Sequence, residues 1–114
     1  MDKNVLSKKK EKLLNSKYPD IHTLIDDLRL IFNYLYNKKV YILRIKDERA
    51  FKSLKKEYLE FLHNEKIERH MRLIEDYELF HGLRLTDVEG GDILRRLKAQ
   101  YAHCKRFFSQ EKLR

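Results

Sequence analysis

Residues 92–108 read DILRRLKAQYAHCKRFF and form the most clearly amphipathic stretch of the chain. At about 3.6 residues per turn, a helix over these residues has one apolar side and one basic side. The apolar side carries Ile93, Leu97, Tyr101, Cys104 and Phe108, with Leu94 beside them. The opposite side carries Arg95, Ala99, Ala102, His103 and Arg106, with Lys98 and Lys105 on one flank and Arg96 near the other. The pattern predicts a helix that buries one face and presents positive charge on the other.

The overall composition favours more helices of the same kind. The chain has 114 residues, a length typical of one domain. Of these residues, 42% are hydrophobic and 39% are charged. High charge with a modest apolar fraction is expected for amphipathic helices around a small core. Three glycines and one proline are too few for the many turns of an all-β fold. The sequence therefore predicts an all-α bundle of about four helices.

The net charge of +8 is concentrated toward the two ends of the chain. Residues 1–17 have six Lys against two acids, and residues 82–114 have eight Lys or Arg against four acids. Residues 47–81 have seven Lys or Arg against nine acids, which makes the middle mildly acidic. Such separation is typical of proteins that bind polyanions. The same charges would also keep a small protein soluble.

Residues 1–17 contain too few apolar positions to fold alone. They either remain a basic arm or form a short helix that packs through Val5, Leu6, Leu13 and Leu14. In both cases, residues 18–114 are expected to form a single helical domain.

The second predicted helix starts at Tyr18-Pro19-Asp20 and is expected to end near Asn37. Its apolar stripe consists of Ile21, Leu24, Leu28, Ile31 and Leu35. The next run, Val40–Ile45, is rich in β-branched and aromatic residues and therefore resembles a strand. It could pair with Leu83–Val88 in a short two-stranded β-ribbon (residues 40–45 with 83–88). Otherwise it continues as helix.

Residues 47–81 predict a long helix with one interruption. Asp47 suits its N-cap, and the apolar stripe is broken at His63-Asn64-Glu65. We therefore expect a kink or short break there, with Asn64 capping the second part. Gly82 is a suitable C-cap. After the connector that follows, Asp92 is expected to cap the last helix, with residues 90–91 (Gly-Gly) as a flexible joint or a plain turn.

The residues needed for enzymatic or metal chemistry are not found in recognisable spacings. Cys104 is the only cysteine, so an internal disulfide is impossible, and its place on the apolar stripe predicts a buried thiol. The histidines are too scattered for a metal site, and no serine elbow or glycine-rich phosphate loop occurs. We expect no enzymatic activity, cofactor, small-molecule substrate or membrane span. A cytoplasmic location is expected, or a nuclear one in a eukaryote.

The first functional hypothesis is a nucleic-acid-binding module that contacts the phosphate backbone. The expected contact residues are Arg95, Arg96, Lys98, His103, Lys105 and Arg106, joined by Lys8, Lys9 and Lys10. The connector before the last helix is too long for a helix-turn-helix, so no base-specific reading by that motif is expected. Tyr34, Tyr41 and Phe107 are the aromatic residues expected to be partly exposed, where they could stack on bases or contact a protein.

The second hypothesis is a small helical adaptor or assembly subunit that binds protein or forms a homodimer, and that could act within a nucleoprotein complex. The mixed-charge faces of residues 47–81 and the wide stripe of residues 21–36 would suit such contacts. Salt separates the two hypotheses. Binding to nucleic acid weakens steeply as salt rises, whereas a hydrophobic protein interface tolerates it.

Overall fold

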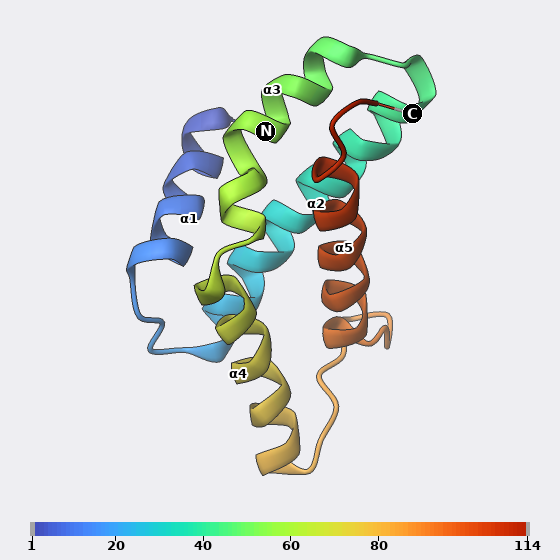
Figure 1. Ribbon diagram of the computed structural model, residues 1–114. Helices are drawn as coiled ribbons and strands as arrows, with labels where there is room; N and C mark the ends of the chain where they lie inside the picture. The colour runs from blue at the N-terminus through green and yellow to red at the C-terminus, as the bar shows by residue number, and fades with distance from the viewer. Residues whose placement is uncertain (1, 114) are drawn as a thin grey trace.

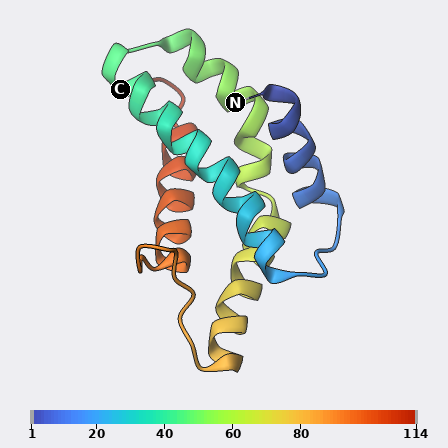
Figure 2. The same cartoon turned by 180° about the vertical axis from the view of Figure 1, so that it is seen from behind.

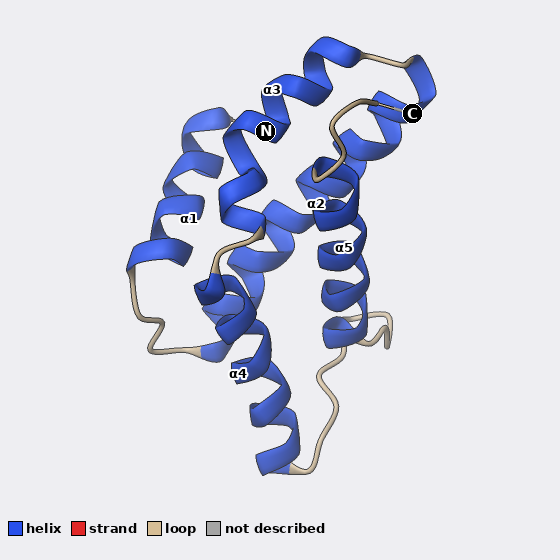
Figure 3. Cartoon of the chain, viewed as in Figure 1, coloured by secondary structure: helices blue, strands red, loops and turns tan. Residues whose placement is uncertain are grey.

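Five α-helices make up the computed structural model, which describes residues 2–113 (Figure 1). They are α1 (Lys3–Asn15), α2 (Ile21–Ile45), α3 (Glu48–Leu62), α4 (Glu65–His81) and α5 (Ile93–Phe108). Figure 3 shows helices joined by loops, with no strand among these residues. The all-helical prediction is confirmed, but the number of helices is five rather than four. The basic N-terminal stretch is helical, which was one of its two expected states, and the expected break near residues 63–65 divides residues 47–81 into two helices.

The caps predicted at Asp47, Asn64, Gly82 and Asp92 are confirmed. Asp47 and Asn64 each accept a hydrogen bond from a backbone N–H in the first turn of α3 and α4. Asp92 does the same for α5, through the backbone N–H of Arg95. Asp20 caps α2 in the same way, so α2 begins at Ile21, in contrast to the predicted start with Pro19 in the first turn. Gly82 ends α4 in the left-handed conformation with φ +60°, which glycine adopts without strain. Most helix boundaries therefore follow from local chemistry.

The predicted end of the second helix at Asn37 and the possible β-ribbon are both wrong, and the alternative, in which residues 40–45 continue as helix, is confirmed. α2 continues through Val40–Ile45 to Lys46, which ends it in the left-handed conformation. Ile42 is fully buried and lies two turns after Leu35, so the helical stripe simply continues. The proposed partner strand is a loop instead, and Thr86 with Asp92 forms the one isolated β-bridge within residues 2–113. Without a partner strand, β-propensity does not determine the structure of residues 40–45.

α1 packs against α2 and α4. Leu6 and Leu13 are buried and Leu14 is partly buried, whereas Val5 is exposed, contrary to the predicted packing surface.

A buried carboxylate joins α1 to α2. Asp27 is 3% exposed and lies 3.2 Å from Lys9 Nζ and 3.8 Å from Lys12 Nζ. The Tyr18 hydroxyl donates a hydrogen bond of 2.5 Å to the same carboxylate. Burial, followed by this hydrogen bond, raises the pKa of Tyr18 above its ordinary value. The cluster supplies the polar partners that a buried carboxylate needs.

The most extensive packing between helices is that of α2 on α5. Asn33 contacts Gln100, Tyr36 lies beside His103, and Lys39 lies over Phe107, so positions advance together along both helices. The two helices therefore run in the same direction. Figure 2 shows them side by side, with α2 nearer the viewer. None of the helices within residues 2–113 is long and apolar enough to cross a membrane.

The predicted faces of α5 are largely confirmed. Ile93, Leu94, Leu97, Cys104 and Phe108 are buried and Tyr101 is partly buried. The prediction for Phe107 is wrong, because its ring is only 3% exposed. Phe51 of α3 covers it edge-on, with the ring centroids 5.2 Å apart. Tyr34 is partly exposed and Tyr41 is 50% exposed, as expected.

Candidate nucleic-acid interface

The outward face of α5 carries two arginines separated by small residues. Arg95, Ala99, Ala102 and Arg106 follow one another at helical spacing, and all four are exposed. Within residues 2–113, no carboxylate lies within ion-pair distance of either arginine. These two guanidinium groups are therefore free to meet an external anion.

The flank of α5 that faces α4 is neutralised by acids of α4. Lys98 Nζ lies 2.5 Å from Glu75 Oε2, and Lys105 Nζ lies 3.1 Å from Glu68 Oε1. Burial alone would lower the pKa of Lys105, but its hydrogen bond to Glu68 and the nearby Tyr101 raise it. Exposed pairs of this kind contribute about 0–1 kcal/mol each. A polyanion could thus compete for both lysines, but they contribute less net charge than the sequence suggested.

Arg96 is bound to the connector before α5. Its Nη1 lies 3.0 Å from Asp87 Oδ2, and Asp87 also accepts hydrogen bonds from the backbone N–H groups of Gly91 and Glu89. The hydrogen bond from Gly91, followed by those from Glu89 and Arg96, lowers the pKa of Asp87. A Cβ at Gly91 would lie 2.9 Å from the Arg96 and Asp87 side chains. The connector is therefore held by a local network around Asp87.

The predicted N-terminal lysines do not join the face of α5. Figures 1 and 2 place α1 and α5 on opposite sides of the bundle. Lys9 is engaged with Asp27, and Lys10 Nζ donates a hydrogen bond of 2.7 Å to the backbone oxygen of Glu57. Lys8 is exposed on α1. Any phosphate contacts made by these lysines would thus belong to a second surface.

α2 contributes cations that the sequence analysis overlooked. Residues 28–46 contain Arg29, Lys38, Lys39, Arg44 and Lys46 and no Asp or Glu. Residues 93–110 likewise contain no acid. Because α2 and α5 are parallel neighbours, these segments together form one surface, here called the acid-free surface: the exposed and half-buried side chains of residues 28–46 and 93–108. The absence of acids was readable in the sequence, but the adjacency of the two segments was not.

His103 lies within the acid-free surface, where α5 meets α2. It is exposed on α5, and its ring centroid is 6.3 Å from that of Tyr36 on α2. Residues 2–113 contain no group of three His, Cys, Asp or Glu side chains that could hold a metal ion. The chemistry offered by this surface is thus that of cations, amides and aromatic rings.

A hollow on α2 lies within this surface. It is lined by Leu30, Asn33, Tyr34, Asn37, Lys38 and Tyr41. Lys38 Nζ lies 5.8 Å from the ring centroid of Tyr34 and 5.8 Å from that of Tyr41. Burial, followed by nearby Glu57, raises the pKa of Tyr34. We call this feature the α2 hollow.

The buried thiol of Cys104 gives the protein an expected loss of stability at alkaline pH. Burial raises the pKa of this thiol from 9.0 to about 11, and burial followed by Glu57 raises the pKa of Tyr58 to about 12. The folded protein keeps these protons at pH values where the unfolded chain releases them. The resulting stability is complete below about pH 9 and is lost as the pH rises. We expect the free energy of unfolding to fall by on the order of 2 kcal/mol between about pH 8.5 and about pH 11.

Urea unfolding followed by circular dichroism at several pH values measures this loss. The Cys104→Ala variant, compared with itself across the same range, should lose less, because only the tyrosine contributions remain. Equal losses in the wild type and the variant would show that the thiol does not contribute.

Comparison with known proteins adds no assignment to this geometry. No protein-family model, curated protein or solved structure matches the chain.

Proposed function

We propose that this protein binds nucleic acid without enzymatic activity, through phosphate contacts made by the acid-free surface. The observation that carries the proposal is that two adjacent parallel helices present cations over residues 28–46 and 93–108, with no acid within either segment. The acids that pair with Arg96, Lys98 and Lys105 come from α4 and the connector. Arg95 and Arg106, which have no ion-pair partner among the described residues, are assigned the principal contacts.

The spacing on α5 suits a phosphate backbone. Arg95 and Arg106 are separated by about 16 Å along the helix axis, so they can reach different phosphates. Ala99 and Ala102 lie between them and leave the helix backbone open to close approach. Arginine forms bidentate hydrogen bonds with phosphate oxygens, which position a strand without reading its sequence.

A purely structural role makes a different prediction for the same charges. Arg44, Lys46 and Arg106 lie near the C-terminal ends of α2 and α5, where cations are stabilised by the helix dipole. If that were their whole purpose, the surface would have no affinity for polyanions. A binding titration distinguishes the two roles.

The titration uses fluorescence anisotropy with short DNA and RNA, single- and double-stranded, at two salt concentrations. We expect micromolar or tighter binding at about 50 mM salt and a loss of at least about tenfold at about 200 mM. The Arg95→Glu/Arg106→Glu variant should bind more weakly. Its plot of log K against log salt should also be shallower by about two, the value for two lost phosphate contacts.

The matched control is Lys56→Glu/Arg72→Glu, which makes the same charge change at exposed positions of α3 and α4. Circular dichroism must first show that both variants are folded. Equal weakening by both pairs would mean that only net charge matters. No binding by the wild type at low salt would overturn the proposal.

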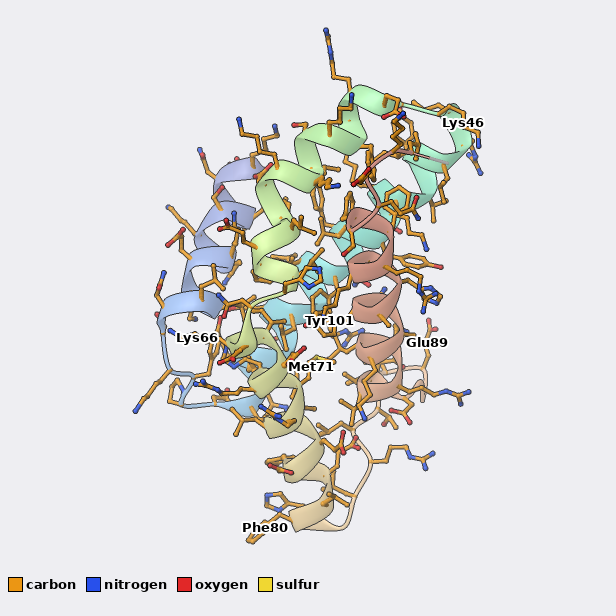
Figure 4. All side chains as sticks on the ribbon, in the orientation of Figure 1. Lys46, Lys66, Met71, Phe80, Glu89 and Tyr101 are labelled. Carbon is orange, nitrogen blue, oxygen red and sulfur yellow. The ribbon has the colours of Figure 1, made fainter. Side chains whose placement is uncertain are left out.

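An exposed apolar end of α4 favours protein binding as a second candidate function. Leu79 and Phe80 in the last turn of α4 are 74% and 86% exposed, and Leu83 just after the helix is 45% exposed. Figure 4 shows Phe80 at the end of α4, pointing away from the bundle. Contiguous apolar side chains exposed in this way commonly mark protein interfaces. This end is separate from the acid-free surface, so an adaptor role and nucleic-acid binding are compatible.

A further inference from the structure

The α2 hollow combines aromatic rings, amides and a cation on one side of one helix. Tyr34 and Tyr41 are two helical turns apart, about 10 Å along the axis, with Lys38 between them. Tyr41 is 50% exposed, so much of its ring is open to solvent. Asn33 and Asn37 add amide groups to the same lining.

We propose that the α2 hollow receives an unpaired base of a single-stranded nucleic acid. This inference rests on the proposed function and names the substrate class. Tyr41 stacks on the base, Asn37 contacts the polar edge of the base, and Lys38 contacts the adjoining phosphate. In a duplex, the face of each base is stacked on its neighbours and its polar edge is paired with the opposite strand. Only an unpaired base can therefore enter the hollow.

The hydrogen-bonding capacity of the two amides supports a polar occupant. Asn33 Oδ1 accepts a hydrogen bond of 2.6 Å from Gln100 Nε2, which leaves the Asn33 NH₂ group with donors to spare. Asn37 is exposed, and its amide carries both donors and an acceptor. Nucleobase edges present the complementary donors and acceptors.

Charge and position connect the hollow to the phosphate contacts on α5. Residues 28–46 carry five cations and no acid. Glu57 of α3 lies near Tyr34 and offsets part of this charge, whereas Lys38 lies beside both tyrosine rings and favours a negatively charged chain over a neutral peptide. Asn33 lines the hollow and also contacts Gln100 of α5. A single strand can therefore place a base in the hollow while its backbone continues over α2 toward Arg95 and Arg106.

The test compares three fluorescent probes of equal length, about 12 nucleotides per strand. They are an oligothymidylate, an abasic strand and a duplex. The full chain is titrated at low salt. We expect the oligothymidylate to bind about tenfold more tightly than the abasic strand and the duplex. The Tyr41→Ala variant should bring the oligothymidylate down to the abasic level and leave abasic binding unchanged.

Matched variants separate this inference from the proposed function. Arg95→Glu/Arg106→Glu should weaken both single strands alike, and Phe80→Ala, an aromatic truncation at the exposed end of α4, should change neither. Equal binding of oligothymidylate and abasic strand by the wild type would overturn the base site while the proposed function stands. A duplex bound as tightly as the oligothymidylate would overturn it too. Failure to bind any probe would overturn both proposals and indicate a protein partner for the hollow.

Discussion

Replacing Phe51 by alanine is expected to lower the free energy of unfolding by about 3–5 kcal/mol. The Phe51 ring is fully buried and stacks on Phe108 with a centroid separation of 6.1 Å, while it meets Phe107 edge-on. It is the main aromatic link between α3 and α5, and α5 in turn covers α2. Truncation removes apolar burial and leaves a cavity that three helices can refill only in part. Domains of this size are stable by about 5–15 kcal/mol, so the loss is a large fraction of the total.

Urea denaturation monitored by circular dichroism measures this effect, and Phe80→Ala is the matched control. The chemical change is identical, but Phe80 is 86% exposed, so the expected change is within about 0.5 kcal/mol. Similar losses in both variants would contradict the assignment of Phe51 to the core.

Replacing Asp27 by alanine is expected to cost about 2–3 kcal/mol. The substitution removes the buried acceptor of the Tyr18 hydroxyl and the common partner of Lys9 and Lys12. The hydrogen bond from the Tyr18 hydroxyl to the buried Asp27 side chain is the larger contribution. The lysine side chains are 35% and 40% exposed, so their ammonium groups can turn to water and lose less.

Asp26→Ala provides the control for Asp27, because the neighbouring residue is exposed and has no ion-pair partner within residues 2–113. Its expected effect is within about 0.5 kcal/mol. A double-mutant cycle of Asp27→Ala with Tyr18→Phe should give a coupling energy above about 1 kcal/mol. Additive effects would show that the two side chains do not stabilise each other.

Features set by local chemistry were predictable from the sequence. The caps at Asp47, Asn64 and Asp92 depend on one side chain and the first turn that follows it, so neighbouring residues are enough to identify them. The buried stripe of α5 follows from helical periodicity alone.

Features set by packing between distant segments were not predictable. Residues 40–45 have strand-forming side chains, yet they continue α2 because Ile42 remains on its buried side and no partner strand exists among the described residues. Phe107 lies at the edge of the α5 stripe, and only the position of α3 decides that its ring is covered. In both cases, tertiary contacts outweigh a local preference.

The candidate site divides in the same way. The outward arginines of α5 were identified from periodicity. The pairing of Lys98 and Lys105 depends on the alignment of α4 with α5, which places Glu75 and Glu68 opposite them. The contribution of α2 depends on its parallel contact with α5, which spacing along the chain does not reveal.

The parallel contact between α2 and α5 also determines the order in which the chain can assemble. α3, α4 and the connector all lie between these helices in the sequence. Helices α1 and α2 can meet early because only a short loop separates them. Contacts between distant segments form late and slow the folding reaction. The side of α2 that faces α5 therefore stays exposed until α5 has packed on it. A nascent or truncated chain that lacks α5 therefore exposes the apolar stripe of α2, and we expect such a chain to aggregate or to be bound by chaperones and cleaved by proteases.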